Sequence, residues 1–386
     1  MGLKINRANW KKVKLGDVAF EYSKRINNPS ESEFDRFVGS SNIDQWDFRV
    51  RNWEPTYSVT STMKLFEPND YLLVRRSLYA SDFRERAPRA HFHGVCSGDI
   101  LTIKENSEKV VDGFLIGVFN SPALWKYVVA NASGSITRRI KWKDLSNYEF
   151  LLPPKDQQAQ LAELLWAMDE VIEREKELLE MLEAAYSTMV DSLFSHKNQD
   201  FVYVTLNEIA EVNKMALKNS HDPNYKFKYL DIASIVEPKS IGELKWIEFK
   251  DAPSRARRIV SDSSIVLSLV RPYFKAFVFI YNSKDVIAST GTGVIDVKPG
   301  HIPKFVFHQF FSKRFMKFCE DRMTGTNYPA ITPSDLDEFQ LAFPSNIETE
   351  KLIVDKLDGI DSTIILTKDK IYSSSTLQKS IINQIF

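Results

Sequence analysis

The sequence predicts an α+β fold in which two mixed α/β domains alternate with two long helices. Three observations lead to this prediction. The second half of the chain repeats the first, each half ends in a heptad pattern of about 40 residues, and the intervening parts contain short apolar runs typical of strands. An internal two-fold repeat suits a target that also comes in two halves. We divide the chain into residues 1–154, 155–196, 197–346 and 347–386.

The repeat is visible at a constant shift along the chain. A shift of 191 residues places Val13–Ala19 on Val204–Ala210 and Phe114–Ile116 on Phe305–Phe307. The same shift gives shorter matches of Ser133–Ser135 with Thr324–Thr326, Ile140 with Ile331, Asp144–Leu145 with Asp335–Leu336, and Pro153 with Pro344. One inserted residue makes the shift 192 in the helices, where Met189–Phe194 falls on Ile381–Phe386.

The two mixed domains contain strand and helix patterns. Short apolar runs predict strands near Asp70–Arg75 and Ser264–Arg271, and the alternation in Val294–Val297 predicts another. Phe114–Val129 and Phe305–Phe318 each predict one short helix, followed by a loop that contains glycine.

The two long helices carry a narrow apolar seam that favours an antiparallel coiled coil between them. In residues 155–196 the seam is Leu161, Leu165, Met168, Ile172, Leu179, Leu182, Tyr186, Met189 and Leu193. In residues 347–386 it is Ile353, Leu357, Ile360, Ile364, Ile371, Ile381 and Ile385. Glu175 interrupts the first seam, and its repeat mate Thr367 interrupts the second, followed by Ser374 and Gln378. The alternative is that each helix packs only against its own domain.

Composition narrows the class of protein. No run approaches the ~18 apolar residues of a membrane span, and the N-terminus lacks the apolar stretch of a signal peptide. Cys96 and Cys319 are at non-equivalent positions, which argues against a disulfide framework, so we expect a cytoplasmic protein. The net charge of zero hides an uneven distribution, because residues 1–154 carry +5, 155–196 carry −7, 197–346 carry +3 and 347–386 carry −1.

Basic loops are the candidate binding residues for a nucleic acid. The loop after the first short helix offers Ser135, Thr137, Arg138, Arg139 and Lys141, and its repeat mate offers Thr326, Asn327 and Tyr328. Hydroxyls and arginine suit phosphate contact, and arginine or asparagine reads base edges bidentately. The flanks of the two loops match and their centres differ, as expected if equivalent loops face different sequences. The alternative is a pair of solvated turns.

Clusters of arginine occur in both mixed domains. The first has Arg75, Arg76, Arg84, Arg86 and Arg89, and the second has Arg255, Arg257, Arg258 and Arg271 with Tyr273 and Lys275. Arginine favours guanine and phosphate recognition. A solvated charged face is the alternative for each cluster.

Catalytic and metal sites are not indicated. His91 and His93 lack a third ligand at a familiar spacing, and the combination of Asp285, Asp296 and Lys298 only loosely imitates a metal-dependent nuclease. No phosphate-binding Gly-x-x-x-x-Gly-Lys-Ser/Thr loop is present. We therefore expect a non-catalytic protein without a cofactor or metal of its own.

Several motifs resemble those of type I restriction–modification specificity subunits. Pro153–Gln158, followed by a long apolar-striped helix with Asp169, resembles their conserved region, as do the openings Val13–Val18 and Val204–Ile209. The resemblance covers the whole chain. The second copy, Pro344–Thr349, lacks the double proline and the paired glutamines.

The resemblance implies a non-catalytic subunit that binds double-stranded DNA. Residues 1–154 and 197–346 would be target recognition domains, each for one half of a bipartite site. The two helices would dock two methyltransferase subunits, and endonuclease/translocase subunits would join them. These partners would carry S-adenosylmethionine, ATP and Mg. The alternatives are a specificity module of another phage-defence or modification system, and a coiled-coil scaffold that does not bind DNA.

Overall fold

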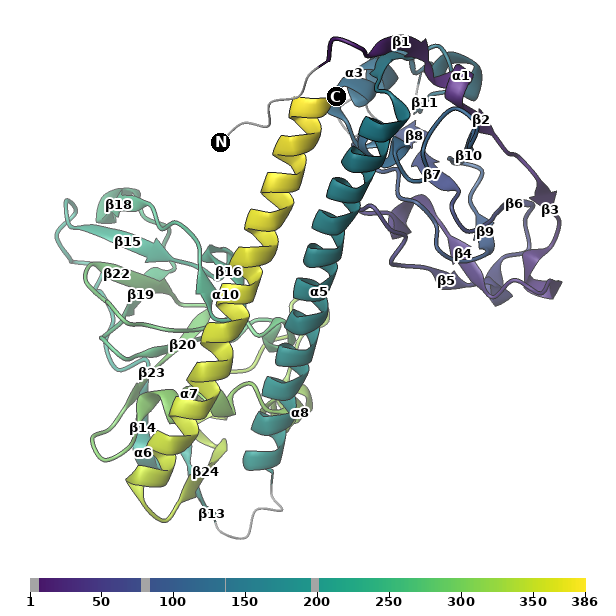
Figure 1. Ribbon diagram of the computed structural model, residues 1–386. Helices are drawn as coiled ribbons and strands as arrows, with labels where there is room; N and C mark the ends of the chain where they lie inside the picture. The colour runs from purple at the N-terminus through teal and green to yellow at the C-terminus, as the bar shows by residue number, and fades with distance from the viewer. Residues whose placement is uncertain (1–6, 78–83, 136, 196–200) are drawn as a thin grey trace. The chain divides into compact units, whose positions relative to one another are not determined.

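The computed structural model describes residues 7–77, 84–135, 137–195 and 201–386 of the chain (Figure 1). The fold is α+β, with many short strands, several short helices and two helices of 39 residues, α5 at Lys155–Leu193 and α10 at Ile347–Ile385. The chain divides into two compact units. Unit 1 comprises Met1–Glu177 and Lys368–Phe386, and unit 2 comprises Leu178–Thr367. Each unit therefore contains parts of both long helices.

The described strands of unit 1 form small sheets with the orders β1-β12, β2-β10-β7, β8-β11 and β3-β6-β9-β4-β5. Their bounds are β1 Lys11–Lys14, β2 Ala19–Glu21, β3 Arg25–Ile26, β4 Arg36–Val38, β5 Glu54–Pro55, β6 Met63–Phe66, β7 Tyr71–Val74, β8 Arg76–Ser77, β9 Gly94–Cys96, β10 Ile100–Glu105, β11 Arg138–Arg139 and β12 Glu149–Leu152. The antiparallel pair β1-β12 closes the unit immediately before α5 begins, since Lys11 lies opposite Leu152.

The described strands of unit 2 form sheets with the orders β13-β24, β14-β23-β20-β21, β18-β15-β22-β19 and β16-β17. Their bounds are β13 Phe201–Thr205, β14 Ala210–Val212, β15 Lys226–Leu230, β16 Ile235–Glu237, β17 Ser240–Ile241, β18 Trp246–Glu248, β19 Ala256–Ile259, β20 Ile265–Ser268, β21 Phe277–Phe279, β22 Val286–Ser289, β23 Thr292–Val297 and β24 Gln340–Pro344. Here β13 pairs with β24, with Phe201 opposite Pro344, shortly before α10 begins.

The prediction of one helix in each of the segments Phe114–Val129 and Phe305–Phe318 was wrong, because each segment forms two. The pairs are α2 Leu115–Phe119 with α3 Pro122–Asn131, and α7 Pro303–Gln309 with α8 Lys313–Arg322. The side chains of Ser121 and Ser312 accept hydrogen bonds from the backbone N–H groups of Leu124 and Phe315, and so cap the second helix of each pair. Pro122 starts α3, since a helix can tolerate proline in its first turn. The other short helices are α1 Leu15–Val18, α4 Trp142–Leu145, α6 Leu206–Ile209 and α9 Pro333–Asp337.

The ends of the two long helices complete the hydrophobic cores of the units. In unit 1, Leu165 of α5 and Ile382 of α10 are fully buried in one cluster with residues of α2 and α3. A Cβ atom on Gly117 would lie 2.3 Å from the Phe386 ring and 2.8 Å from Leu165, so only glycine allows this close approach. In unit 2, Phe194 and Leu357 occupy the equivalent cluster, with the Phe194 ring 5.4 Å from Phe305.

Polar contacts fix the first turns of each helix to its unit. In unit 1 the buried Gln158 accepts a hydrogen bond from the Val111 N–H at 2.9 Å and donates one to the Pro153 carbonyl at 2.8 Å. In unit 2 the buried Glu350, 192 residues later, accepts one from the Ile302 N–H at 3.1 Å. The second helix start lacks the paired glutamines of the first, but a carboxylate makes the corresponding contact.

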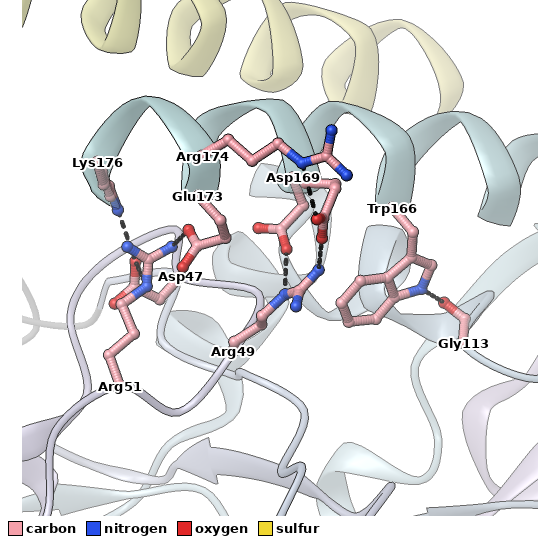
Figure 2. Close-up of polar contacts among 10 residues, drawn as sticks. Asp47, Arg49, Arg51, Gly113, Trp166, Asp169, Glu173, Arg174 and Lys176 are labelled. Carbon is pink, nitrogen blue, oxygen red and sulfur yellow. Dashed lines mark hydrogen bonds and ion pairs between the residues drawn. The ribbon is translucent and has the colours of Figure 1, made fainter. Parts of the chain in front are cut away.

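An ion-pair cluster in unit 1 joins a loop to the middle of α5 (Figure 2). Arg49 Nε donates to Asp169 Oδ2 at 2.6 Å and Arg51 pairs with Glu173, while Trp166 Nε1 donates to the Gly113 carbonyl at 3.1 Å. Burial raises the pKa of the Asp169 carboxyl above its ordinary value, although Arg49 opposes that shift.

Unit 2 has a more buried cluster at the corresponding part of α10. Lys239 Nζ lies 2.6 Å from Asp361 Oδ1 and 3.4 Å from the centre of the Tyr186 ring. Lys304 pairs with Asp358 at 2.6 Å, and His308 Nε2 lies 3.1 Å from the same carboxylate. Burial lowers the pKa of the Lys239 ammonium to about 8.

Truncation of a helix residue in the core of unit 1 should destabilise that unit. We expect Leu165→Ala to cost about 2–5 kcal/mol, because the fully buried side chain leaves a cavity beside Gly117 and Phe386. Six of the seven tryptophans lie in unit 1, so denaturant unfolding followed by tryptophan fluorescence reports mainly on this unit. Leu377→Ala, at an exposed position of α10 within the same unit, is the control and should change stability by less than about 0.5 kcal/mol. Equal losses in the two variants would show that the end of α5 is not part of the core.

Candidate nucleic-acid interface

In unit 1 the structure brings together two arginine-bearing segments that are far apart in the sequence. β8 and β11 pair antiparallel, with Arg139 opposite Arg76 and Arg138 opposite Ser77. The Ile140 N–H donates to the Arg75 carbonyl at 3.0 Å, which continues the pairing. We call residues 75–77 and 133–140, apart from 136, the loop pair of unit 1. It unites the basic loop with the first two members of the arginine cluster.

Glycine makes the turn of this loop pair possible. Gly134 has φ +129°, and a Cβ atom there would lie only 2.1 Å from the Thr137 carbonyl oxygen. The Ser133 and Arg139 backbones exchange hydrogen bonds of 3.0 and 2.9 Å across the turn. The positions of Arg138 and Arg139 therefore follow from backbone pairing and from a residue with left-handed geometry.

The arginines of this loop pair outnumber the carboxylate near them. Arg76 and Arg139 share Asp99, at 2.7 and 3.2 Å, while Arg138 donates to the Ala132 carbonyl at 2.7 Å. About half of the Arg139 side chain remains accessible, at 46%. Ser135 and Lys141 are exposed and Thr137 is half-buried. This arrangement holds arginines in fixed orientations with an excess of positive charge, as contact with phosphates or base edges requires.

Unit 2 has a corresponding arrangement, which we call the loop pair of unit 2 (residues 269–275 and 324–330). Val270 forms a β-bridge with Ala330, and the Arg271 N–H donates to the Pro329 carbonyl at 2.7 Å. Arg271 Nη2 donates to the Asn327 carbonyl at 2.8 Å, and its guanidinium lies 4.8 Å from the centre of the Tyr328 ring. Thr326, Asn327, Tyr328 and Tyr273 are exposed, and Lys275 is half-buried. The predicted loop residues Asn327 and Tyr328 thus contact Arg271, and Tyr273 and Lys275 follow Arg271 in the adjacent turn.

The remaining arginines of the two predicted clusters are placed differently. Arg89 has a 10% exposed side chain and pairs with Asp112 and Glu105, so its guanidinium is committed to an internal network. Arg86 donates to the Ser40 carbonyl at 3.2 Å, and Arg84 is exposed. Spacing along the sequence grouped these residues with Arg75 and Arg76, but the structure does not pair them with β11.

In the second cluster, the three arginines near residue 257 belong to another sheet. Arg258 lies in β19, where its backbone forms a bridge with Ala216, and Arg257 stacks over Phe249 at 4.8 Å. Arg255 is exposed. Their contact with a nucleic acid stays a prediction.

Sequence reasoning missed one residue of the unit 2 surface. Phe274 is 63% exposed and follows Tyr273 in the 3₁₀ turn Pro272–Phe274. Two adjacent aromatic residues between Arg271 and Lys275 were the available signal, since aromatic side chains in a basic turn are unusual on a solvated surface.

The described residues contain one group whose geometry could suit a metal ion, formed by His308, Asp358 and Asp361 in unit 2. Their ligand atoms lie within 4.8 Å of one another. Lys304 and Lys239 already pair with the two carboxylates, so the negative charge that would attract a cation is balanced. Neither His91 nor His93 belongs to this group. None of the described helices combines the length and apolar character of a membrane span.

Comparison with known proteins gives a consistent result. The type I restriction modification DNA specificity domain matches residues 198–373. The specificity subunit of the type I restriction enzyme MjaVIII from Methanocaldococcus jannaschii is 22% identical over 316 residues, which cover 75% of this chain and 73% of that protein. The putative MjaX specificity subunit of the same organism is also 22% identical, over 326 residues that cover 78% and 72% of the two chains.

Solved structures share the fold. The S subunit of a type I restriction–modification system from M. genitalium aligns with a TM-score of 0.61 at 14% identity, covering 100% of this chain and 98% of that one. A chain from a study of complex assembly in a type I system aligns with a TM-score of 0.56 at 17% identity, covering 98% and 97%. The matching domain and the two named relatives make this chain similar to specificity subunits, the non-catalytic components, of type I restriction–modification systems.

Proposed function

We propose that this chain is the specificity subunit of a type I restriction–modification system. It would read a bipartite sequence in double-stranded DNA and dock two methyltransferase subunits, with endonuclease/translocase subunits added to the complex. One observation carries the proposal. Each unit has a loop pair in which backbone pairing holds cationic side chains beside a glycine turn, and the two loop pairs differ in the residues that they present. Similar frames with different side chains are what two half-sites of different sequence require.

An internal two-fold repeat supports this division of labour. The order strand, short helix, strand opens both halves, as β1-α1-β2 and β13-α6-β14, and both halves close with a short helix, a strand and a long helix. Contacts recur at the repeat shift as well. Gln158 contacts Val111 as Glu350 contacts Ile302, and Trp166 contacts Gly113 as Asp358 contacts Lys304. We infer that the two target recognition domains descend from one ancestral half.

The long helices are proposed to form an antiparallel coiled coil. All of the seam residues in α5 and α10 are buried or half-buried. Within unit 1, Leu165 and Met168 share a core cluster with Ile381 and Ile385, and within unit 2, Met189 and Leu193 share one with Ile360 and Ile364. The helix ends also pack against the globular parts, and this packing is compatible with the proposed coiled coil.

Docking of partner subunits is supported by apolar side chains outside the seam. Exposed large residues on the two helices include Val171, Leu178, Met181, Leu352, Ile365, Leu366, Tyr372 and Leu377. Exposed apolar groups of this number favour a protein interface over a solvated surface. The partners would supply S-adenosylmethionine, ATP and Mg chemistry, and we propose a cytoplasmic location for the complex.

The decisive experiment is DNA binding by the full chain reconstituted with methyltransferase subunits. We expect sequence-specific binding. The logarithm of its association constant should fall linearly with the logarithm of the salt concentration, because phosphate contacts release counterions. Single-molecule sequencing of modified DNA should give a methylated motif in two parts. If the complex assembles but does not bind DNA, the alternative of a coiled-coil scaffold is favoured. If the DNA carries a methylated motif but no endonuclease subunits join the complex, a specificity module of another modification system is favoured.

Arg139 is expected to read one position of the first half-site. Arg139→Ala should cost about 1–3 kcal/mol in binding to the cognate site and relax one base, since a bidentate arginine–guanine contact is lost. Affinity and methylated motif are both measured. Lys126→Ala removes an exposed positive charge of α3 in the same unit and is the matched control. A uniform loss of affinity with a smaller salt dependence would assign Arg139 to phosphate contact instead.

Base recognition should be separable between the halves. Exchange of residues 13–154 for the equivalent domain of a relative should change one half of the methylated motif and leave the other intact, because the loop pair of unit 2 is untouched. The motif is measured by sequencing modified DNA from cells that carry the hybrid. A change in both halves would mean that the two domains do not read independently.

A further inference from the structure

A basic turn of unit 2 carries two adjacent exposed aromatic rings. Phe274 is 63% exposed and Tyr273 45% exposed, and their rings lie 4.8 Å apart at 59°. Tyr328, 71% exposed, contacts the guanidinium of Arg271, which precedes the turn. We call Arg271, Tyr273, Phe274, Lys275 and Tyr328 the aromatic patch. Single exposed aromatic residues are common, but two adjacent exposed rings between two cations, one of which contacts a third ring, need an explanation.

The backbone of the turn is strained in a way that presents these rings outward. Arg271 and Lys275, on either side of the turn, both have left-handed backbone conformations, with φ of 49° and 52°. Residues with a Cβ atom adopt this conformation only when surrounding contacts impose it, and such strain gathers at functional sites. Without it, the chain would not reverse around Pro272–Phe274 in so few residues.

Surrounding contacts hold the turn rigid. Pro272 is buried, and the turn packs against α8. The Phe274 N–H donates to the Arg271 carbonyl at 3.0 Å, and the Lys275 N–H donates to the Pro272 carbonyl at 2.8 Å. Immediately afterwards, Phe277 is fully buried in the core of unit 2. The two exposed rings are therefore fixed in place before any partner binds.

Charge and ring chemistry identify the occupant of the patch. The Arg271 guanidinium contacts neutral groups, the Asn327 carbonyl and the Tyr328 ring, so its charge is available to an anion. Rigid aromatic rings between cations complement stacked bases between phosphates, because each base has a π-face and each phosphate a negative charge. A protein partner would match the patch equally well only if its surface had acidic groups spaced around an apolar pocket.

We propose that Phe274 inserts between neighbouring base pairs of the second half-site and kinks the duplex there. This inference rests on the proposed function and adds a mode of recognition to it. Phe274 is the inserting ring because it is more exposed than Tyr273 and has no polar group to desolvate. Tyr273 supports it from one side, and Arg271 and Lys275 contact the phosphates on either side of the opened step. Specificity then includes the ease with which a base step unstacks, in addition to base-edge contacts.

The test uses the full chain with its methyltransferase subunits and duplexes that carry 2-aminopurine at successive positions of the second half-site. Unstacking raises the fluorescence of this base, and end-labelled duplexes report bending by energy transfer. We expect the wild-type complex to brighten one step and to bend the duplex. Phe274→Ala should abolish both signals and weaken binding roughly tenfold, since one base–aromatic stacking contact is lost.

Two control variants sharpen the experiment. Phe274→Leu should keep much of the bend, because leucine also serves as a wedge. Tyr57→Ala removes a 77% exposed ring of unit 1 and should leave the second half-site signals unchanged. Since Phe274 is largely exposed, its variants should unfold at the wild-type temperature.

Several outcomes would overturn the proposal, and they differ from failure of the proposed function. One such outcome is a wild-type complex that binds its site without raising 2-aminopurine fluorescence at any step. Another is a Phe274→Ala variant with unchanged fluorescence, bending and affinity. In both cases the proposed DNA recognition stands, but insertion of Phe274 is ruled out. If Phe274→Ala instead weakens methyltransferase assembly with unchanged DNA signals, the patch is a protein contact. A wild-type complex without any sequence-specific binding would remove the proposed function and the wedge together.

Discussion

The architecture depends on a packing constraint, which is that each globular core is completed by the ends of two helices from distant parts of the chain. In unit 1, Leu165 from α5 and Ile382 and Phe386 from α10 close the core over Gly117. In unit 2, Phe194 and Leu357 do the same. Neither core can be complete until residues about 200 positions apart have come together, so the fold has many long-range contacts, which slow folding. In return, each globular part packs directly against the helix segments of its own unit.

Polar contacts on the helices add orientation to this attachment. Asp169 and Asp361 are 192 residues apart, and each binds a cation from the globular part of its unit, Arg49 or Lys239. The ion pair between Arg49 and Asp169 in unit 1 is partly accessible to water, whereas the Lys239 ammonium lies over the rings of Tyr186 and Phe311. Buried ion pairs contribute little net stability but penalise any other arrangement, because a displaced partner leaves an unpaired buried charge. We therefore assign these clusters to positioning.

The loop pairs show how a conserved frame carries different side chains. Pairing of β8 with β11 fixes which arginines point toward Asp99, and the bridge from Val270 to Ala330 fixes Arg271 beside Tyr328. The frame consists of backbone hydrogen bonds and glycine turns, so its side chains can change without loss of the fold. Such independence is what a protein needs if its specificity is to evolve while its architecture stays constant.

The sequence by itself determined the α+β class and the two long helices, and it carried the resemblance to the specificity subunits. Heptad spacing is a local property, and the helices at Lys155–Leu193 and Ile347–Ile385 lie where that spacing occurs. Short helices were less predictable, because the serine caps at Ser121 and Ser312 divided segments whose apolar pattern is continuous. The candidate interface was found only in part. Arg76 and Arg139 were both proposed, but their common partner Asp99 was not.

Only the tertiary structure distinguished arginines that look alike in sequence. Arg89 is held by Glu105 and Asp112, whereas Arg139 remains half-accessible beside the glycine turn. It also revealed Phe274, exposed by two left-handed residues, and showed Glu350 in the place of Gln158. The physical reason is that periodicity and propensity act over a few residues, while the availability of a side chain depends on charges and surfaces that folding brings from elsewhere in the chain.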